Sequence, residues 1–320
     1  MECGYYNRDL CHSCTAIEVA YGRQLERKQE LVRGLVDPLG SPRWLAPVAS
    51  AEAGFRNKAK MVVAGEVGAP TLGILDGTRG TDLRDCPLYP APVTRALHAL
   101  GEFISRVRLL PYDVAKRRGE LKHVVVTGSP EGRLMVRFML RSTRQLPKIR
   151  ENMDLLHELV PAADVVSVNL QPEHKAVIEG PEEILLTERS ELVMTVNGIG
   201  LRVRPRSFFQ TNTAVTERLY AQVAEWVSAA DPVSVWDLYC GVGGFALHVA
   251  DPAREVVGTE ISPEAVASAR DTARAMGLPE AGPGSVRFLA DDAAATPADL
   301  PGTPELAIVN PPRRGLDASL

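Results

Sequence analysis

The stretch that most constrains how this chain can fold runs from residue 233 to residue 260. An apolar run over 233–239 ends in a glycine-rich turn over 240–244, helix-compatible residues follow over 245–250, and a second apolar run over 255–259 leads to Glu260. This order of elements is typical of an α/β domain that binds a nucleoside cofactor: a strand, a glycine loop, a helix, a second strand and an acidic residue. Gly241 and Glu260 lie 19 positions apart, near the spacing of about 20 between a nucleotide loop and a ribose-binding carboxylate.

The glycine loop itself favours S-adenosylmethionine over a dinucleotide. Its sequence, Gly241-Val242-Gly243-Gly244, lacks the third glycine at the spacing that a pyrophosphate requires. A D-x-x-C-G-x-G-G turn fits S-adenosylmethionine better, because that ligand has no phosphate to cradle. Its glycines lack the Cβ that would hold a ligand away from the main chain. Taken alone the loop is equally compatible with an ordinary tight turn, and Glu260 together with the segment ending in Asn310 decides for a nucleoside cofactor.

Charge is distributed unequally between the two parts of the chain. Residues 211–320 carry 7 basic and 15 acidic side chains, whereas residues 1–210 carry 29 basic and 25 acidic ones. Basic clusters in the front part, at 116–122, 141–150 and 202–206 among others, predict contact with a polyanion. For any single cluster the alternative is a solvated surface. No apolar run approaches a membrane span and no signal peptide is recognisable, so we expect a cytoplasmic protein.

Three cysteines open the chain in the pattern C-x7-C-x2-C, and a fourth follows much later. Cys3, Cys11, Cys14 and Cys86 can supply four thiolates to a zinc ion or to an iron–sulfur cluster. Proline follows Cys86, which favours the cluster. Four unrelated thiols are the alternative.

Hydrophobic periodicity divides the chain into two regions. Before residue 210 the pattern predicts helices over 17–36, 93–108 and 148–159, strands over 60–67, 71–75, 124–127, 134–140 and 165–170, and a hairpin over 193–203. From residue 213 strands and helices alternate, with a helix opened by Ser262-Pro263 and a last strand at 306–309. We therefore predict an antiparallel α+β region followed by half of a doubly wound parallel sheet.

Seven segments together resemble one known family, the RumB/RlmC-type 23S rRNA (uracil-C5)-methyltransferases, within the broader RNA m5U methyltransferases. They are CGYYNRDLCHSC at 3–14, FRNKAK at 55–60, Cys86-Pro87, SFFQTN at 207–212, WDLYCGVGGFALH at 236–248, VVGTEIS at 256–262 and VNPPRRGL at 309–316. The resemblance implies a Rossmann-like methyltransferase domain over 201–320, preceded by an iron–sulfur and RNA-binding region over 1–200. Within that region the cluster segment is expected over about 1–90 and the antiparallel part over about 91–200.

The resemblance also implies roles for individual residues. A [4Fe-4S] cluster would be bound by Cys3, Cys11, Cys14 and Cys86, and S-adenosylmethionine would be contacted by Gln210, Tyr239, Glu260 and Asn310. The RNA partner would be 23S rRNA, methylated at C5 of a uridine. Uracil C5 is a poor nucleophile, so a cysteine thiolate first adds to C6 and a base later removes the C5 proton.

The family's nucleophilic cysteine follows the strand after the NPPR loop, and this sequence ends at Leu320. We therefore expect a C-terminally truncated enzyme that lacks the nucleophile and base and has an incomplete sheet, and we assign no catalytic residue. Cys240 lies in the cofactor loop and is interpreted as a packing residue. Three alternatives stay open: a catalytically inactive RNA-binding iron–sulfur protein, a tRNA uracil-C5 methyltransferase, and an exocyclic-amine methyltransferase.

Overall fold

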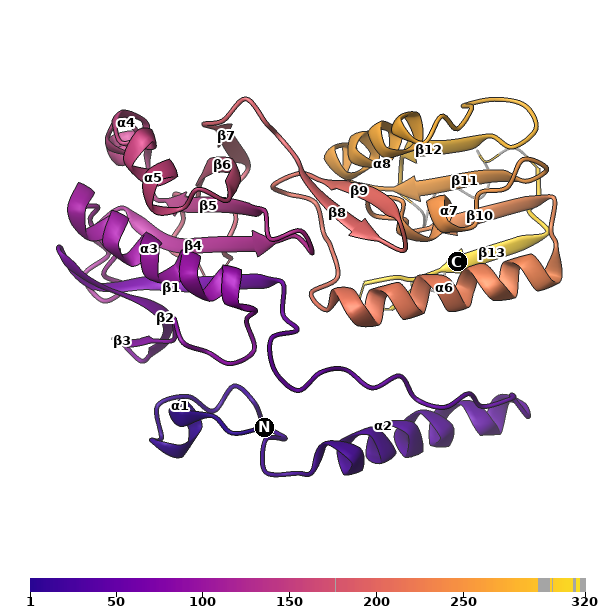
Figure 1. The fold of residues 1–320 in the computed structure, drawn as a ribbon, viewed down its shortest axis with the longest axis horizontal. Helices are drawn as coiled ribbons and strands as arrows, with labels where there is room; N and C mark the ends of the chain where they lie inside the picture. Colours follow the sequence, from indigo (N-terminus) through magenta and orange to yellow (C-terminus); the bar gives the residue numbers. More distant parts are fainter. Residues whose placement is uncertain (176, 293–299, 301, 313–314, 317–320) are drawn as a thin grey trace. The chain divides into compact units, whose positions relative to one another are not determined.

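The computed structural model describes residues 1–175, 177–292, 300, 302–312 and 315–316. The chain forms two compact units, and each unit is assembled from three stretches of sequence. The first consists of Met1–Val126, Phe138–Val160 and Leu170–Glu179, and the second of Thr127–Arg137, Pro161–Asn169 and Gly180–Leu320. Figure 1 shows their helices and strands.

The N-terminal segment contains the short helix α1 (Gly4–Asn7) and the longer helix α2 (Tyr21–Val36). The predicted start of α2 at Ile17 is wrong by one turn of helix, because Cys14–Ile17 and Ala16–Val19 form hydrogen-bonded turns first. Asp37-Pro38 ends α2 as expected, but the chain continues as the 3-10 helix η1 (Asp37–Leu39). Proline is compatible with the first turn of a helix, where its missing N–H has no intrahelical partner.

A seven-stranded sheet follows, with strand order β3-β2-β1-β4-β5-β6-β7. Strands β1 and β2 pair antiparallel, as do β2 and β3, which confirms the antiparallel character predicted there. Two of its strands, β3 and β7, are not predicted by the sequence. The strand bounds are Lys58–Glu66, Ala69–Asp76, Arg79–Asp82, Leu121–Gly128, Leu134–Leu140, Ala163–Leu170 and Glu182–Leu185 for β1 to β7 in turn.

Helix α3 (Ala91–Val107) packs on this sheet in the first unit and contacts β2 and α5. Its buried residues Val93, Leu97, Leu100 and Ile104 recur three or four positions apart, which places them on one face. The helix predicted over 148–159 is wrong as a single element. It is interrupted at Asn152, so that η2 (Thr143–Gln145) and α4 (Leu146–Glu151) are followed by α5 (Met153–Leu159).

The hairpin predicted around Asn197-Gly198 is confirmed. Strands β8 (Leu192–Val196) and β9 (Ile199–Val203) pair antiparallel with Val196 opposite Ile199. Asn197 and Gly198 both have positive φ, 49° and 83°, which is the combination that a tight two-residue hairpin turn requires.

The second unit also contains a four-stranded parallel sheet in the order β12-β11-β10-β13 (Figure 1). This is the predicted half of a doubly wound sheet. Helices α7 and α8 contact its strands, and α6 contacts α7. The bounds are α6 Thr213–Ala230, β10 Ser234–Leu238, α7 Gly244–His248, β11 Glu255–Glu260, α8 Pro263–Ala275, β12 Val286–Ala290 and β13 Leu306–Val309.

Local signals in the sequence set where these helices begin. Asn212 caps α6, because its side-chain oxygen accepts a hydrogen bond from the Val215 amide at 3.2 Å. Ser262 caps α8 in the same way through the Ala265 amide at 3.3 Å, with Pro263 in the first turn as predicted. Ser262 thus fixes the point where the chain turns from β11 into α8, at the carboxyl end of that strand.

Candidate functional site

Three predicted cofactor residues lie at one edge of the parallel sheet. Tyr239, Glu260 and Asn310 lie at the carboxyl ends of β10, β11 and β13. Leu238 pairs with Thr259 on one side and with Val309 on the other, so the three residues leave the sheet at the same level. The carboxyl ends of parallel strands are where open α/β sheets bind their ligands.

The carboxylate of Glu260 is held by main-chain amides of the glycine loop and of the turn that opens α8. Its Oε2 accepts a hydrogen bond from the Gly241 amide at 3.2 Å, and its Oε1 accepts one from the Ser262 amide at 2.9 Å. The Cys240 amide in turn donates to the Thr259 carbonyl at 2.9 Å. The loop and the acid, predicted from a spacing along the sequence, are therefore in direct contact and hold each other in place.

Backbone geometry explains why the loop is rich in glycine. Gly241 and Gly243 have φ of 57° and 80°, in the left-handed region that favours glycine. A Cβ at Gly243 would lie 2.7 Å from the ring of Phe288, and one at Gly244 would clash with the Tyr220 hydroxyl. Close packing at the start of α7 thus requires glycine at 243 and 244, and the positive φ favours it at 241 and 243.

Asp237 is a site residue to which sequence reasoning assigned no role beyond opening the loop motif. Its side chain is fully buried, and Oδ2 accepts a hydrogen bond from the Ala246 amide at 2.9 Å. Oδ1 has no hydrogen-bond partner among the residues described. Burial raises the pKa of this carboxyl to about 7, and the negative charge of Glu260 acts in the same direction. The carboxyl thus ties β10 to the first turn of α7, below the loop.

The remaining two cofactor candidates differ in setting. Gln210 is half-buried and lies two residues before Asn212, the residue that caps α6. Asn310 is exposed where β13 ends, and the described residues after it are Pro311, Pro312, Gly315 and Leu316. The two arginines of the VNPPRRGL motif fall outside the described residues.

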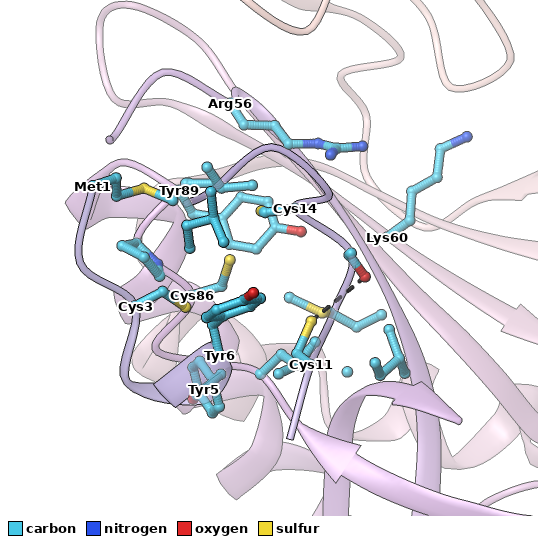
Figure 2. A pocket seen from close by; sticks show the side chains of 18 residues that line it. Met1, Cys3, Tyr5, Tyr6, Cys11, Cys14, Arg56, Lys60, Cys86 and Tyr89 are labelled. Carbon is cyan, nitrogen blue, oxygen red and sulfur yellow. Dashed lines mark hydrogen bonds between the residues drawn. The ribbon is translucent and has the colours of Figure 1, made fainter. Parts of the chain in front are cut away.

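A second candidate site lies in the first unit and contains the four predicted metal ligands. Cys3, Cys11, Cys14 and Cys86 line one cavity of about 200 Å³. Figure 2 shows them around this cavity together with aromatic and basic side chains. The other lining residues that Figure 2 labels are Met1, Tyr5, Tyr6, Arg56, Lys60 and Tyr89. Residues more than 70 positions apart in the sequence therefore meet in one place.

The thiols in this cavity influence one another. Burial raises the pKa of Cys14, and the neighbouring Cys11 and Cys3 raise it further. Burial also raises the pKa of Cys86, with further contributions from Cys14, Cys3 and Cys11 that oppose the hydrogen bond from the Leu88 amide. Four clustered thiolates would repel one another unless a cation or a metal cluster compensated their charge.

The arrangement of these thiols differs from a mononuclear site. Among the described residues, no three His, Cys, Asp or Glu side chains are placed to hold a single metal ion. A tetrahedral zinc site needs every sulfur about 2.3 Å from one ion. In a cluster each thiolate binds a separate iron, which allows the sulfurs to lie further apart. His12 is not among the lining residues, and its ring contacts Asp9 at 2.7 Å instead.

Comparison with known proteins identifies relatives over the whole chain. A protein-family model described as tRNA (Uracil-5-)-methyltransferase matches residues 184–276. The 23S rRNA (uracil(747)-C(5))-methyltransferase RlmC of Pectobacterium carotovorum is 45% identical over 323 residues, covering 100% of this chain and 84% of that relative. The protein of the same name from Halothiobacillus neapolitanus is 46% identical over 326 residues with the same coverage.

The chain belongs to the RlmC-type 23S rRNA (uracil-C5)-methyltransferases. A solved structure agrees with this at the level of the fold. The Pyrococcus abyssi tRNA (uracil-54, C5)-methyltransferase, crystallised with S-adenosyl-L-homocysteine, superposes with a TM-score of 0.73 at 20% identity. The match covers 94% of this chain and 69% of that protein. The S-adenosylmethionine-dependent methyltransferase fold predicted for the second part of the chain is confirmed.

In this RlmC-type chain Cys240 is a packing residue. Its side chain is buried in the core of the second unit, beside Val242 and Phe245, and burial raises the pKa of its thiol well above the ordinary value. The charges of Asp237 and Glu260 raise that pKa further. A thiol held protonated in this way is a poor nucleophile, so the structure supports the interpretation made from the sequence.

The described part of the RlmC-type chain contains no helix that combines the length and the apolar character needed to cross a membrane.

Proposed function

We propose that this chain binds S-adenosylmethionine at the carboxyl edge of the parallel sheet and holds it as the methyl donor for C5 of uridine 747 in 23S rRNA. One observation carries the cofactor site: the Gly241 amide and the Glu260 carboxylate are in contact at the level where Tyr239 and Asn310 leave neighbouring strands. The choice of nucleotide rests on the relatives, whose names specify uracil 747.

Each cofactor residue has a role that its position supports. Glu260 would accept hydrogen bonds from ribose hydroxyls, because its carboxylate is fixed by two amides yet half-exposed. Tyr239 would line the cofactor pocket beside Glu260. The side-chain amide of Asn310 would contact the cofactor from the end of β13. Gln210 would contact the cofactor from the segment that precedes α6. When bound, the cofactor supplies a methyl group on a sulfonium centre.

The methylated carbon needs activation that none of the five cysteines is suited to provide. Four of them line the cavity of the first unit, and Cys240 is buried and protonated. We accordingly assign no nucleophile within these 320 residues. The residues named above serve to bind and orient the methyl donor.

We further propose that Cys3, Cys11, Cys14 and Cys86 bind a [4Fe-4S] cluster. Their convergence on one cavity supports this proposal. The basic residues Arg56 and Lys60 on the cavity wall would offset negative charge on a thiolate-ligated cluster. In this proposal residues 1–200 contain the cluster and contact the RNA, and residues 201–320 bind the methyl donor.

A methyl-transfer assay tests the proposed function. The alignment covers 84% of the Pectobacterium relative, so the assay compares two proteins. One is this chain, and the other is a chimera that also carries the uncovered part of the Pectobacterium relative. Unmodified 23S rRNA and methyl-labelled S-adenosylmethionine are added, and nucleosides are identified by mass spectrometry.

We expect 5-methyluridine at position 747 from the chimera, and S-adenosylhomocysteine binding from both proteins. Two results would overturn the proposal: a methyl group on an adenine or guanine nitrogen, or labelling of tRNA in preference to 23S rRNA. Binding of rRNA and S-adenosylhomocysteine without transfer by the chimera would favour the inactive RNA-binding alternative.

A further inference from the structure

Two basic clusters that lie apart in the sequence line one cavity in the first unit. Arg118 comes from the loop before β4, whereas Arg141, Arg144 and Lys148 come from the segment after β5. The cavity has a volume of about 510 Å³ and Glu120 is its one acidic lining residue among those described. Four cationic side chains thus face one carboxylate around a space that is open to solvent.

The single carboxylate is already neutralised within the protein. Glu120 is almost fully buried, and its Oε1 accepts a hydrogen bond from Arg141 at 3.2 Å while its Oε2 accepts one from the Ser142 hydroxyl at 2.6 Å. The other three cations are exposed. Lys148 donates to the Arg108 carbonyl at 3.2 Å, and Arg118 and Arg144 have no acidic partner among the described residues. The excess positive charge is therefore available to an external anion.

The backbone around the cavity is held in a fixed conformation. Asp113 and Arg118 exchange two main-chain hydrogen bonds, of 2.7 and 3.2 Å, which close the loop that carries Arg118. Gly119 follows with φ of 101°, and a Cβ there would clash with the Pro111 carbonyl. Opposite this loop, the buried Gln145 side chain accepts a hydrogen bond from the Leu110 amide at 2.7 Å. Both walls of the cavity are thus built by buried contacts, and the arginines project from them.

We propose that this cavity binds phosphate groups of the rRNA backbone and positions the RNA on the first unit. The inference rests on the proposed function, which makes 23S rRNA the partner. Arginine guanidinium groups match phosphate oxygens in geometry and charge. No aromatic side chain lines the cavity among the residues described, so stacking on bases is not its role. Contacts of this kind set register and affinity without reading sequence.

The test is RNA binding by a double variant and by a charge-matched control. Arg118→Gln/Arg144→Gln removes the two cations that have no acidic partner in the described part of the chain. Arg79→Gln/Arg95→Gln removes two exposed arginines of the same unit, one on β3 and one on α3, that do not line the cavity. A fluorescent 23S rRNA fragment centred on uridine 747 is titrated with each protein between about 50 and 200 mM salt.

We expect the cavity variant to bind the fragment about tenfold more weakly at low salt. The slope of log affinity against log salt should be shallower by about 0.7 for each phosphate of single-stranded RNA that the variant no longer neutralises. The control should bind like the wild type, and all three should bind S-adenosylhomocysteine equally. Arg118→Lys/Arg144→Lys retains the charges and should restore most of the affinity, which shows that a weaker Gln variant reflects charge rather than misfolding.

The failures of the two proposals are distinguishable. If the wild type binds the fragment and the cavity variant matches the Arg79/Arg95 control, the cavity does not bind RNA and only this inference is wrong. The same holds if the Lys variant binds as weakly as the Gln variant. If the wild type does not bind the 23S rRNA fragment at all, the proposed function itself fails.

Discussion

The Glu260 side chain is held in a fixed orientation at the carboxyl edge of the parallel sheet. Its two oxygens already accept hydrogen bonds from Gly241 and Ser262, so the carboxylate is oriented before a ligand arrives. We expect Glu260→Gln to weaken S-adenosylhomocysteine binding at least tenfold, because hydrogen bonds to a charged group contribute about 1.5–3 kcal/mol. Calorimetric titration measures the effect, and Glu255→Gln, at an exposed position on the same strand, is the matched control. Equal affinities for both variants would remove Glu260 from the site.

Asp237 gives a second residue-scale prediction, which concerns pH. Its pKa is raised by burial to about 7 in the folded protein, from 3.8. Between these values the unfolded chain loses the proton while the folded chain keeps it, so this group makes folding less favourable as pH rises, until the folded pKa is passed. The neutral variant Asp237→Asn lacks this effect. We expect its urea midpoint to rise relative to wild type from pH 4 to about pH 7 and then to stay level.

Between these pH values the free energy of unfolding of the variant should rise relative to that of the wild type by a few kcal/mol at most, since one pKa unit corresponds to about 1.4 kcal/mol. Urea melts at a series of pH values measure it, because the midpoint and slope give the free energy of unfolding. Parallel pH profiles for the two proteins would show that Asp237 ionises normally.

At the scale of secondary structure, strand β7 depends on a buried ion pair. Arg137 on β5 is fully buried and donates to both carboxylate oxygens of Glu183 on β7, at 2.9 and 2.6 Å. The Ser167 hydroxyl donates to the same carboxylate at 2.6 Å. Removing one partner of a buried pair leaves an uncompensated charge and costs about 3–5 kcal/mol.

We therefore expect Glu183→Gln to lower the free energy of unfolding by several kcal/mol in urea melts. The double variant Arg137→Met/Glu183→Leu should recover most of the loss, because both charges are then replaced by apolar groups. A double variant as unstable as the single one would indicate that packing, rather than charge, holds β7 in the sheet. Glu182→Gln, at an exposed neighbour on the same strand, should have little effect.

This pair also explains why β7 could not be predicted. Glu182-Glu183 reads as a polar segment, and only the fold reveals that Arg137, more than 40 positions away, neutralises Glu183. Likewise, no local signal separates α4 from α5. Elements with strong periodicity or caps, such as the Asn197-Gly198 hairpin and the Ser262-Pro263 helix start, follow from the sequence alone. Elements that depend on a distant partner do not.

The candidate sites show the same difference between what sequence motifs predict and what only the fold brings together. Motif spacing predicted that Gly241 and Glu260 belong to one site, and the structure places them in hydrogen-bond contact. The burial of Asp237 was not foreseeable, because it depends on how α7 packs over β10. The basic cavity could not be predicted from the sequence either, since Arg118 and Arg144 become neighbours only through the fold. The boundary at residue 200 between a cluster region and a cofactor region stays a prediction.

At the scale of the whole molecule, the cysteine cavity joins the N-terminal segment to residues near Cys86. Cys3 and Cys86 lie 83 positions apart, and a cluster would close the loop between them. A metal group that is bound only by the folded state adds its binding free energy to the stability of that state. The cluster should therefore contribute to the stability of the first unit as a whole.

Purification without oxygen, followed by iron and sulfide analysis, tests this. We expect iron and sulfide in equal amounts in the wild type, and Cys86→Ser should lose most of both together with several degrees of thermal stability. Cys240→Ala is the matched control, because it removes the one cysteine outside the cavity and should retain the iron. Removal of iron by a chelator should lower the melting temperature of the wild type and leave that of Cys86→Ser unchanged. Zinc in place of iron would contradict the cluster, and an iron content in Cys86→Ser equal to that of the wild type would remove Cys86 from its proposed ligands.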